Sequence, residues 1–187
     1  FARKEDVYSN LASKFYGFEV TKEHPTERGT GKQLELSCGY GAGAETIVIT
    51  AKRGTYGPPV FLTLEQGYDA RDLYRETHPG VVDYWSEAGR IINHLIAGTT
   101  YEWGPVTVHE GRLWGPDGTF LQFPELCWRP DARMPNGDLL EPHYGYKSRK
   151  GWTKLYGGKL TENVIQWLAR INIAEDIREL LRLGYKI

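Results

Sequence analysis

The sequence predicts an α+β protein that is mainly helical, and three observations support this class. Apolar residues recur at helical spacing over most of residues 1–98 and again near the C-terminus. Residues 99–123 instead form short alternating segments separated by glycine and proline, which is typical of an antiparallel hairpin or meander. The length of 187 residues suits one ordinary domain or two small ones. We expect a helical subdomain over 1–98, then a hairpin, a basic aromatic loop and a C-terminal helix over 99–187.

The first three elements follow from local spacing and chain breakers. Apolar residues recur every four positions in residues 6–16, which predicts a helix that Gly17 ends. A second helix is predicted from about Thr26 to Cys38. Residues 45–52 could form a short helix or a strand, because most of them are β-branched.

Two more helices have clear start signals. Thr63 is a predicted N-cap with Gln66 at the capping-box position, and this helix should run to about Thr77. Pro79 can open the next helix, which Gly98 would end.

The C-terminal part mixes irregular and helical patterns. Residues 128–152 are polar and we expect them to be irregular. Helix is predicted from Leu160 to Leu183, with Thr161 as its N-cap. The last residues, 185–187, look like the start of a strand, which suggests a piece of a longer protein.

Composition excludes several classes of protein. The chain has 23 Lys and Arg against 24 Asp and Glu, so it cannot be uniformly basic, although a local basic patch is compatible with this balance. No apolar run approaches the roughly 20 residues that span a membrane, so we expect no membrane partner. Cys38 and Cys127 are too few for a disulfide framework and favour a reducing compartment. The dispersed histidines predict no metal site.

A first candidate site lies in the second predicted helix. Arg28, Lys32 and Leu36 are spaced by four and would form one stripe that leads to Tyr40 and Gly41. Two cations suit a triphosphate, since arginine offers a fork of donors and lysine a movable charge that can also donate a proton. An aromatic ring beyond them can stack on a base. The same spacing is common on solvated helix faces, so the pattern alone leaves both readings open.

A second candidate is the stretch 143–159, which combines cations and aromatic rings without an acidic residue. Nucleic acids bind such combinations, because cations contact phosphates and rings stack on bases. The alternative is a solvated basic loop whose aromatic residues fill a core. The residues concerned are Lys147, Arg149, Lys150, Lys154 and Lys159, with Tyr144, Tyr146, Trp152 and Tyr156.

Five segments, in order along essentially the whole chain, carry a family resemblance. They are Asp6-Val-Tyr8, Arg28-x3-Lys32-x7-Tyr40-Gly41, Tyr74-Arg-Glu-Thr-His-Pro79, Gly118-Thr-Phe-Leu-Gln-Phe-Pro124 and Tyr156-Gly-Gly-Lys-Leu-Thr-Glu-Asn-Val-Ile-Gln166. Together they resemble the family A DNA polymerases, in particular the bacteriophage-type branch. The resemblance implies that residues 1–98 are the helical fingers subdomain and that 99–187 hold a hairpin and a helix of the palm.

The resemblance also implies roles for residues near the incoming dNTP. Arg28 and Lys32 match the residues that hold the triphosphate, and Lys32 would be the catalytic acid for the leaving pyrophosphate. Tyr40 matches the aromatic residue at the insertion site, and Gly41 matches the glycine that lets the template pass close to the backbone. Tyr8 stands where many relatives have a histidine that touches the phosphates.

Further matches and departures lie outside this group. Lys159, Asn163 and Gln166 fall in the stretch that matches the palm helix on the minor groove of primer–template DNA. Leu36 stands where better-known members have Phe or Tyr, and Ile171 stands where phage-type relatives usually have Asp.

The catalytic carboxylates of the family are missing from the chain. The resemblance puts the motif A aspartate before Phe1 and the motif C carboxylates after Ile187. The full-length enzyme would therefore use Mg²⁺, while we expect none to bind this chain and no polymerase activity from it alone. The implied partners are dNTP, primer–template DNA and the remainder of the polymerase chain, in the cytoplasm of a bacterial host.

Two alternatives stay open. The chain could be a non-enzymatic nucleic-acid-binding module that reuses the fingers fold. Less favoured is a domain rich in Trp and Tyr that binds carbohydrate or protein through its aromatic residues, because aromatic content says little about the type of ligand.

Overall fold

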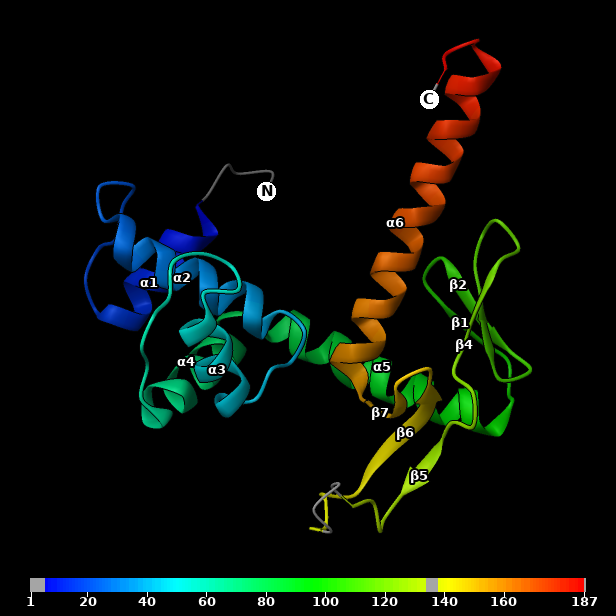
Figure 1. Cartoon of the computed structure of the whole chain (residues 1–187), viewed down its shortest axis with the longest axis horizontal. Helices are drawn as coiled ribbons and strands as arrows, with labels where there is room; N and C mark the ends of the chain where they lie inside the picture. Colours follow the sequence, from blue (N-terminus) through cyan, green and yellow to red (C-terminus); the bar gives the residue numbers. More distant parts are fainter. Residues whose placement is uncertain (1–5, 134–137, 187) are drawn as a thin grey trace. The chain divides into compact units, whose positions relative to one another are not determined.

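The computed structural model describes residues 6–133 and 138–186. Within this part, the chain forms six helices and two small antiparallel sheets, which confirms the α+β class (Figure 1). It divides into two compact units, Phe1–Trp85 and Ser86–Ile187. The division falls inside the fifth helix, upstream of the boundary after residue 98 that the sequence suggests.

The first unit is helical. The segment 45–52, which the sequence left open between helix and strand, is helix, and it buries Ile47 and Ala51 one turn apart. Gly54 ends this helix with a φ of 65°, in the left-handed region that glycine tolerates best. The helices of this unit are α1 (Val7–Tyr16), α2 (Pro25–Cys38), α3 (Ala44–Arg53), α4 (Leu64–Thr77) and the beginning of α5 (Pro79–Ala97).

Side chains cap two helices of the first unit, and one of these caps, Thr63 with Gln66, is the one that the sequence predicts. The carboxylate of Asp6 accepts a hydrogen bond from the Ser9 N–H at 3.4 Å and so caps α1. Thr63 and Gln66 form the complete capping box of α4, with side chain–backbone bonds of 2.9 and 3.1 Å. These two caps satisfy backbone donors that a helix start leaves unpaired.

Close packing of α1 on α2 depends on Gly31. A Cβ atom at this position would lie 2.1 Å from the carbonyl oxygen of Tyr8, far inside van der Waals contact. A fully buried amide, Gln33, fixes the loop after α3: its Nε2 donates to the Pro58 carbonyl at 3.1 Å and its Oε1 accepts from the Tyr56 N–H at 3.2 Å. The core of this unit consists of Leu11, Leu34, Cys38, Ile47, Ala70 and Tyr74.

The second unit contains both sheets. The first is a four-stranded meander in the order β1-β2-β3-β4, as the sequence predicts for residues 99–123. The second has the order β5-β6-β7, with β5 paired to β6 and β6 to β7. The strands are β1 (Tyr101–Trp103), β2 (Val106–His109), β3 (Arg112–Trp114), β4 (Phe120–Gln122), β5 (Cys127–Arg129), β6 (His143–Ser148) and β7 (Gly151–Leu155).

The prediction that residues 128–152 are irregular is wrong for three segments, which are β5, β6 and β7. Only one face of their sheet packs on the core, where Tyr144 and Tyr146 contact buried residues and Leu155 is itself buried. The other face carries Gly145, the exposed ring of Trp152 and otherwise mostly polar residues, so the apolar alternation is too sparse to mark strands.

The last helix, α6, spans Gly157–Arg182 and begins earlier than predicted. Its N-cap residue is Tyr156, so the assignment of that position to Thr161 is wrong: Thr161 is buried, and its hydroxyl donates to the Gly157 carbonyl at 2.9 Å. Tyr185 and Lys186 belong to no strand, and Ile187 lies outside the described residues.

The second core joins α5, both sheets and the start of α6. Its buried members are Ala88, Ile91, Ile92, Leu95, Trp103, Val106, Val108, Leu113, Phe123, Leu155, Leu160 and Val164. Ile171 is the last buried residue of α6, and apolar residues beyond it, such as Ile173 and Leu181, are exposed. Within the described residues, no helix is long and apolar enough to cross a membrane.

Candidate functional site

Arg28 and Lys32 lie one turn apart on α2, on the side away from the core. Both side chains are half-buried, and the helix directs them opposite to its buried residues, because positions four apart share a face. The structure thus brings two cations onto one solvent-facing stripe. The buried residues of α2 are Thr30, Gly31, Gln33, Leu34, Ser37 and Cys38.

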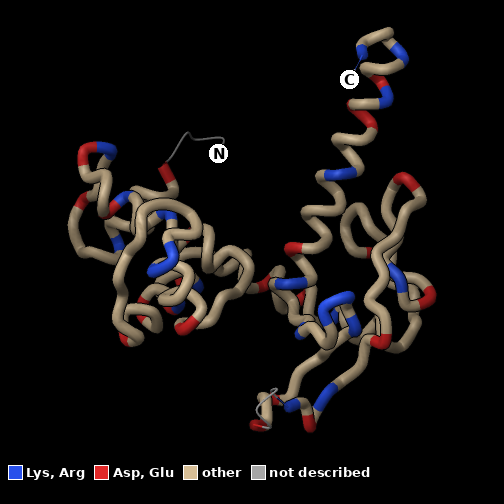
Figure 2. Tube along the Cα trace, viewed as in Figure 1, with Lys and Arg blue, Asp and Glu red and all other residues tan. Residues whose placement is uncertain are grey.

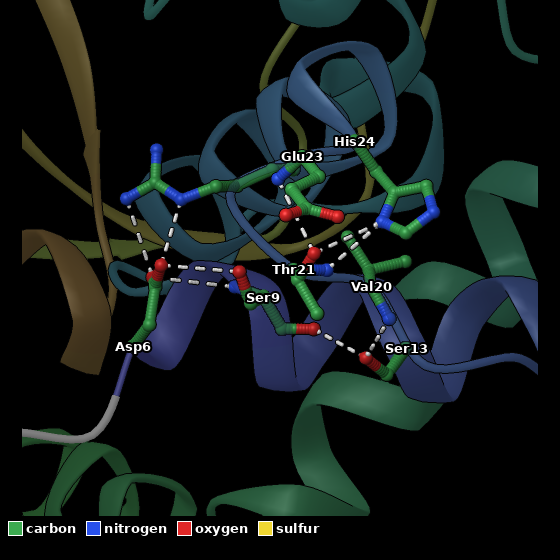
Figure 3. Close-up of polar contacts among 8 residues, drawn as sticks. Asp6, Ser9, Ser13, Val20, Thr21, Glu23 and His24 are labelled. Carbon is green, nitrogen blue, oxygen red and sulfur yellow. Dashed lines mark hydrogen bonds and ion pairs between the residues drawn. The ribbon is translucent and has the colours of Figure 1, made fainter.

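The Arg28 guanidinium is held against the start of α1. Its Nε lies 2.7 Å from Asp6 Oδ2, its Nη2 lies 3.3 Å from Asp6 Oδ1, and its Cζ lies 5.4 Å from the centroid of the Tyr8 ring. Asp6 also accepts bonds from the backbone and hydroxyl of Ser9, and Figure 3 shows it at the beginning of α1. Arg28 and Tyr8, both predicted to contact phosphates, are therefore neighbours, and Nη1 makes no hydrogen bond within the described residues.

This ion pair sets the charge at the site. Hydrogen bonding to Arg28 holds the pKa of the Asp6 carboxyl below its ordinary value, and Asp6 in turn raises the pKa of Arg28. Both groups are therefore charged at neutral pH, and an anionic ligand at Arg28 must compete with the Asp6 carboxylate. The pairing joins residues 22 positions apart, so no local sequence pattern reveals it.

Lys32 differs from Arg28 in having no partner. Across residues 6–133 and 138–186, its ammonium group makes no hydrogen bond or ion pair, and the side chain is half exposed. An ammonium group in this state can approach a phosphate without first giving up a protein contact.

Tyr40 and Gly41 lie beyond the end of α2. Tyr40 is 36% exposed, two residues after the last residue of α2. Gly41 has a φ of 77°, and its N–H donates to the Cys38 carbonyl at 2.8 Å. This left-handed turn supplies a local reason for glycine at position 41.

A buried polar cluster lies behind this turn. Glu35 Oε2 is 3.4 Å from His78 Nε2, while the rings of His78 and Tyr74 have centroids 4.5 Å apart. Burial raises the pKa of Glu35, against the opposing effect of His78, and it raises the pKa of the Cys38 thiol to about 12. Cys38 is therefore an inert thiol at neutral pH, which excludes it as a nucleophile.

In the second unit, the predicted DNA-contact residues of α6 are only partly brought together. Asn163 and Gln166 share an open pocket with Arg170, Gln122, Tyr146 and Trp167. Lys159 does not line this pocket: its Nζ lies 2.6 Å from the Glu162 carboxylate, which also accepts a bond from the Gln166 amide at 3.2 Å. Arg170 is the cation in this pocket that sequence reasoning missed.

The basic and aromatic stretch 143–159 fits both alternatives that the sequence left open, because some of its aromatic residues fill the core and others are exposed. Tyr144 and Tyr146 pack on the core, whereas Trp152 is 44% exposed, and the guanidinium carbon of Arg129 lies 4.2 Å from the centroid of its ring. Figure 2 shows that positions of basic and acidic residues are interspersed along the chain trace of both units.

The described residues contain no group of three or more His, Cys, Asp and Glu side chains arranged to hold a metal ion. Comparison of the chain with protein-family models, curated protein sequences and solved structures finds no match.

Proposed function

We propose that this chain is the dNTP- and primer–template-binding part of a template-directed DNA polymerase of the bacteriophage-type family A branch. The observation that carries the proposal is the solvent-facing stripe of α2, where, among the described residues, Lys32 is unpaired and Arg28 keeps one terminal nitrogen without a partner. The five family-like segments named above add the polymerase assignment.

At the nucleotide site, the proposed steps are binding and proton donation. Lys32 would bind the β- and γ-phosphates as a point charge and donate a proton to the leaving pyrophosphate. Arg28 would contact the same phosphates through the nitrogen that Asp6 leaves unpaired, while Tyr8 packs against the guanidinium. Tyr40 would stack at the insertion site, and Gly41 would let the template pass.

Primer–template contact is proposed for α6. Asn163 and Gln166 carry amides that can both donate and accept, which suits the acceptor groups of the minor groove. Lys159 would contribute to binding through phosphate contact after release from Glu162. The partners of the chain would be DNA, dNTP and the remainder of the polymerase chain, in the cytoplasm of a phage-infected bacterium.

The chain supplies no metal ligand in this proposal. The family resemblance implies that the carboxylates that hold the ions would belong to the remainder of the polymerase. The pure chain should therefore show no primer extension in magnesium-containing buffer, and measurable extension would contradict the division of roles.

Titration of the 187-residue chain with a fluorescent dNTP analogue in metal-free buffer tests the nucleotide site. We expect Arg28→Ala with Lys32→Ala to weaken binding at least about tenfold, because two charge-assisted contacts are lost. The matched control is Lys52→Ala with Arg53→Ala, which removes two exposed cations from the end of α3 in the same unit. Equal affinity of the two double variants would overturn the proposal.

A further inference from the structure

One face of the β5-β6-β7 sheet is basic and open to solvent. We call it the outer basic face and define it as Arg129, Gly145, Lys147, Trp152 and Lys154. Directly paired residues point to the same side of a sheet, and the register pairs Lys147 with Trp152 and Gly145 with Lys154. Arg129 lies on the same side, because its guanidinium covers the Trp152 ring.

The other face of this sheet belongs to the core. Trp128, Tyr144 and Leu155 are paired across it, and Leu155 is 1% exposed. The two faces therefore differ. Tyr144 and Leu155 hold one face against the core of the second unit, with Trp128 left half exposed on it, whereas the outer basic face is left to bind something else.

Gly145 explains how Arg129 can lie over the Trp152 ring. A Cβ atom at position 145 would lie 2.9 Å from Arg129 Cδ and 3.6 Å from the Trp152 ring. The missing side chain leaves room for the arginine to cross the centre of the sheet. Within the described part of the chain, Arg129 has no carboxylate partner, so its full charge and its N–H donors are left for a ligand.

The charge of this face suits a polyanion. Lys154 is exposed and unpaired among the described residues, and Arg149 and Lys150 are exposed in the turn between β6 and β7. Lys147 lies 3.3 Å from Glu125, but both side chains are more than half exposed, and such a contact is weak. No acidic residue occurs between positions 143 and 159.

The exposed indole ring specifies the kind of polyanion. A base stacks on an aromatic ring only when its own face is free, and the bases of a duplex are already stacked on one another. Cations around a single ring are the arrangement of proteins that hold single strands with little sequence preference. We propose that the outer basic face binds single-stranded nucleic acid, with a base on Trp152 and phosphates on Arg129, Lys147 and Lys154.

This site is separate from the α6 residues proposed for primer–template DNA and does not depend on the polymerase assignment. It would hold an unpaired stretch of strand, whereas Asn163 and Gln166 would contact a duplex. The two proposals can therefore fail independently.

The test is fluorescence anisotropy of a labelled 12-nucleotide oligo(dT) with the full chain. We expect Trp152→Ala to weaken binding about tenfold, because stacking of one base is lost. The control is Trp128→Ala, which removes a similarly exposed ring, 50% against 44%, from the opposite face of the same sheet. That control should stay within about twofold of the parent chain, since Trp128 offers no cation-flanked surface.

Further measurements distinguish a loss of base stacking from unfolding of the chain and from non-specific attraction between charges. Trp152→Phe should recover most of the affinity, because phenylalanine keeps a ring for stacking. A 12-base-pair duplex should bind more weakly than the single strand, while oligo(U) should bind like oligo(dT). Equal losses from Trp152→Ala and Trp128→Ala, or a preference for the duplex, would overturn the proposal.

Discussion

Arg28 in the first unit and Arg129 in the second are held in opposite ways. A carboxylate fixes Arg28, with Asp6 oxygens 2.7 and 3.3 Å from its nitrogens, whereas an aromatic ring fixes Arg129 at 4.2 Å. The carboxylate offsets the positive charge, and the ring leaves it in place. A phosphate at α2 would therefore have to share Arg28 with Asp6 or displace Asp6, whereas the described residues place no carboxylate on Arg129 at the outer basic face.

The largest expected effect comes from a substitution that destabilises the first unit and leaves the second unit intact. It should therefore affect only one of the two proposed binding sites. Gly31→Ala forces a methyl group into the Tyr8 carbonyl and should destabilise the α1–α2 contact by about 3 kcal/mol. Nucleotide binding should fall with it, while oligo(dT) binding at the outer basic face should persist. Hydrogen exchange of the α1 and α2 amides measures the destabilisation.

Gly29→Ala is the matched control in the same helix. Position 29 has open space, with nothing within 4 Å of the added Cβ, so alanine should stabilise α2 by about 0.5–1 kcal/mol. If the two substitutions changed exchange in the same direction, close packing at Gly31 would not be what holds α1 against α2.

The next largest effect concerns stability at acidic pH. The contact of Arg28 with Asp6 should make stability depend on pH, whereas the contact of Arg129 with Trp152 should not. The folded pKa of Asp6 lies below its ordinary value of 3.8, so the pair stabilises the fold above pH 3.8 and loses this effect as the pH falls through the folded pKa. Asp6→Asn keeps an N-cap but removes the charge, which should cost at most about 1 kcal/mol at pH 7.

Urea unfolding of the parent chain and of Asp6→Asn at several pH values measures this difference. The gap between them should shrink between pH 5 and strongly acidic solution. Trp152→Phe, by contrast, should give a pH-independent gap, because the substitution changes no ionisable side chain. A constant gap for Asp6→Asn would show that the ion pair contributes nothing to folding.

The smallest effect concerns salt. Lys154→Ala should reduce the slope of log affinity for oligo(dT) against log salt concentration by about 0.7, the value for one phosphate contact on a single strand. Lys52→Ala, in the other unit, should leave the slope unchanged. Anisotropy titrations at three or more salt concentrations measure both slopes, and identical slopes would remove Lys154 from the site.

Local signals predicted the helices of the first unit well. Thr63 with Gln66, and Gly17 after α1, are caps whose chemistry lies within a few residues. The β5-β6-β7 sheet escaped prediction for two reasons. The pairing of β5 with β6 is non-local, since Arg129 pairs with His143 across a connection with no strong pattern. The β6-β7 hairpin is local, but its apolar alternation is too sparse to mark strands. The early start of α6 escaped prediction because two glycines open it.

The same distinction between local signals and tertiary contacts applies to the candidate sites. The stripe of Arg28 and Lys32 follows from helical spacing alone, so the sequence was sufficient. Asp6 and Arg129 come to their sites through tertiary contact, from outside the segments that local composition singles out. Whether Tyr40 shares a ligand with the two cations stays a prediction.

The buried amide of Gln33 has a mechanical consequence for α2. The helix that carries Arg28 and Lys32 also holds the loop at Tyr56 and Pro58 through two hydrogen bonds to Gln33. Breaking these two bonds would leave buried polar groups without hydrogen-bond partners, which would destabilise the fold by about 1–3 kcal/mol for each group. Helix and loop should therefore move as one rigid body. If α2 moves when the proposed nucleotide binds, the loop should move with it.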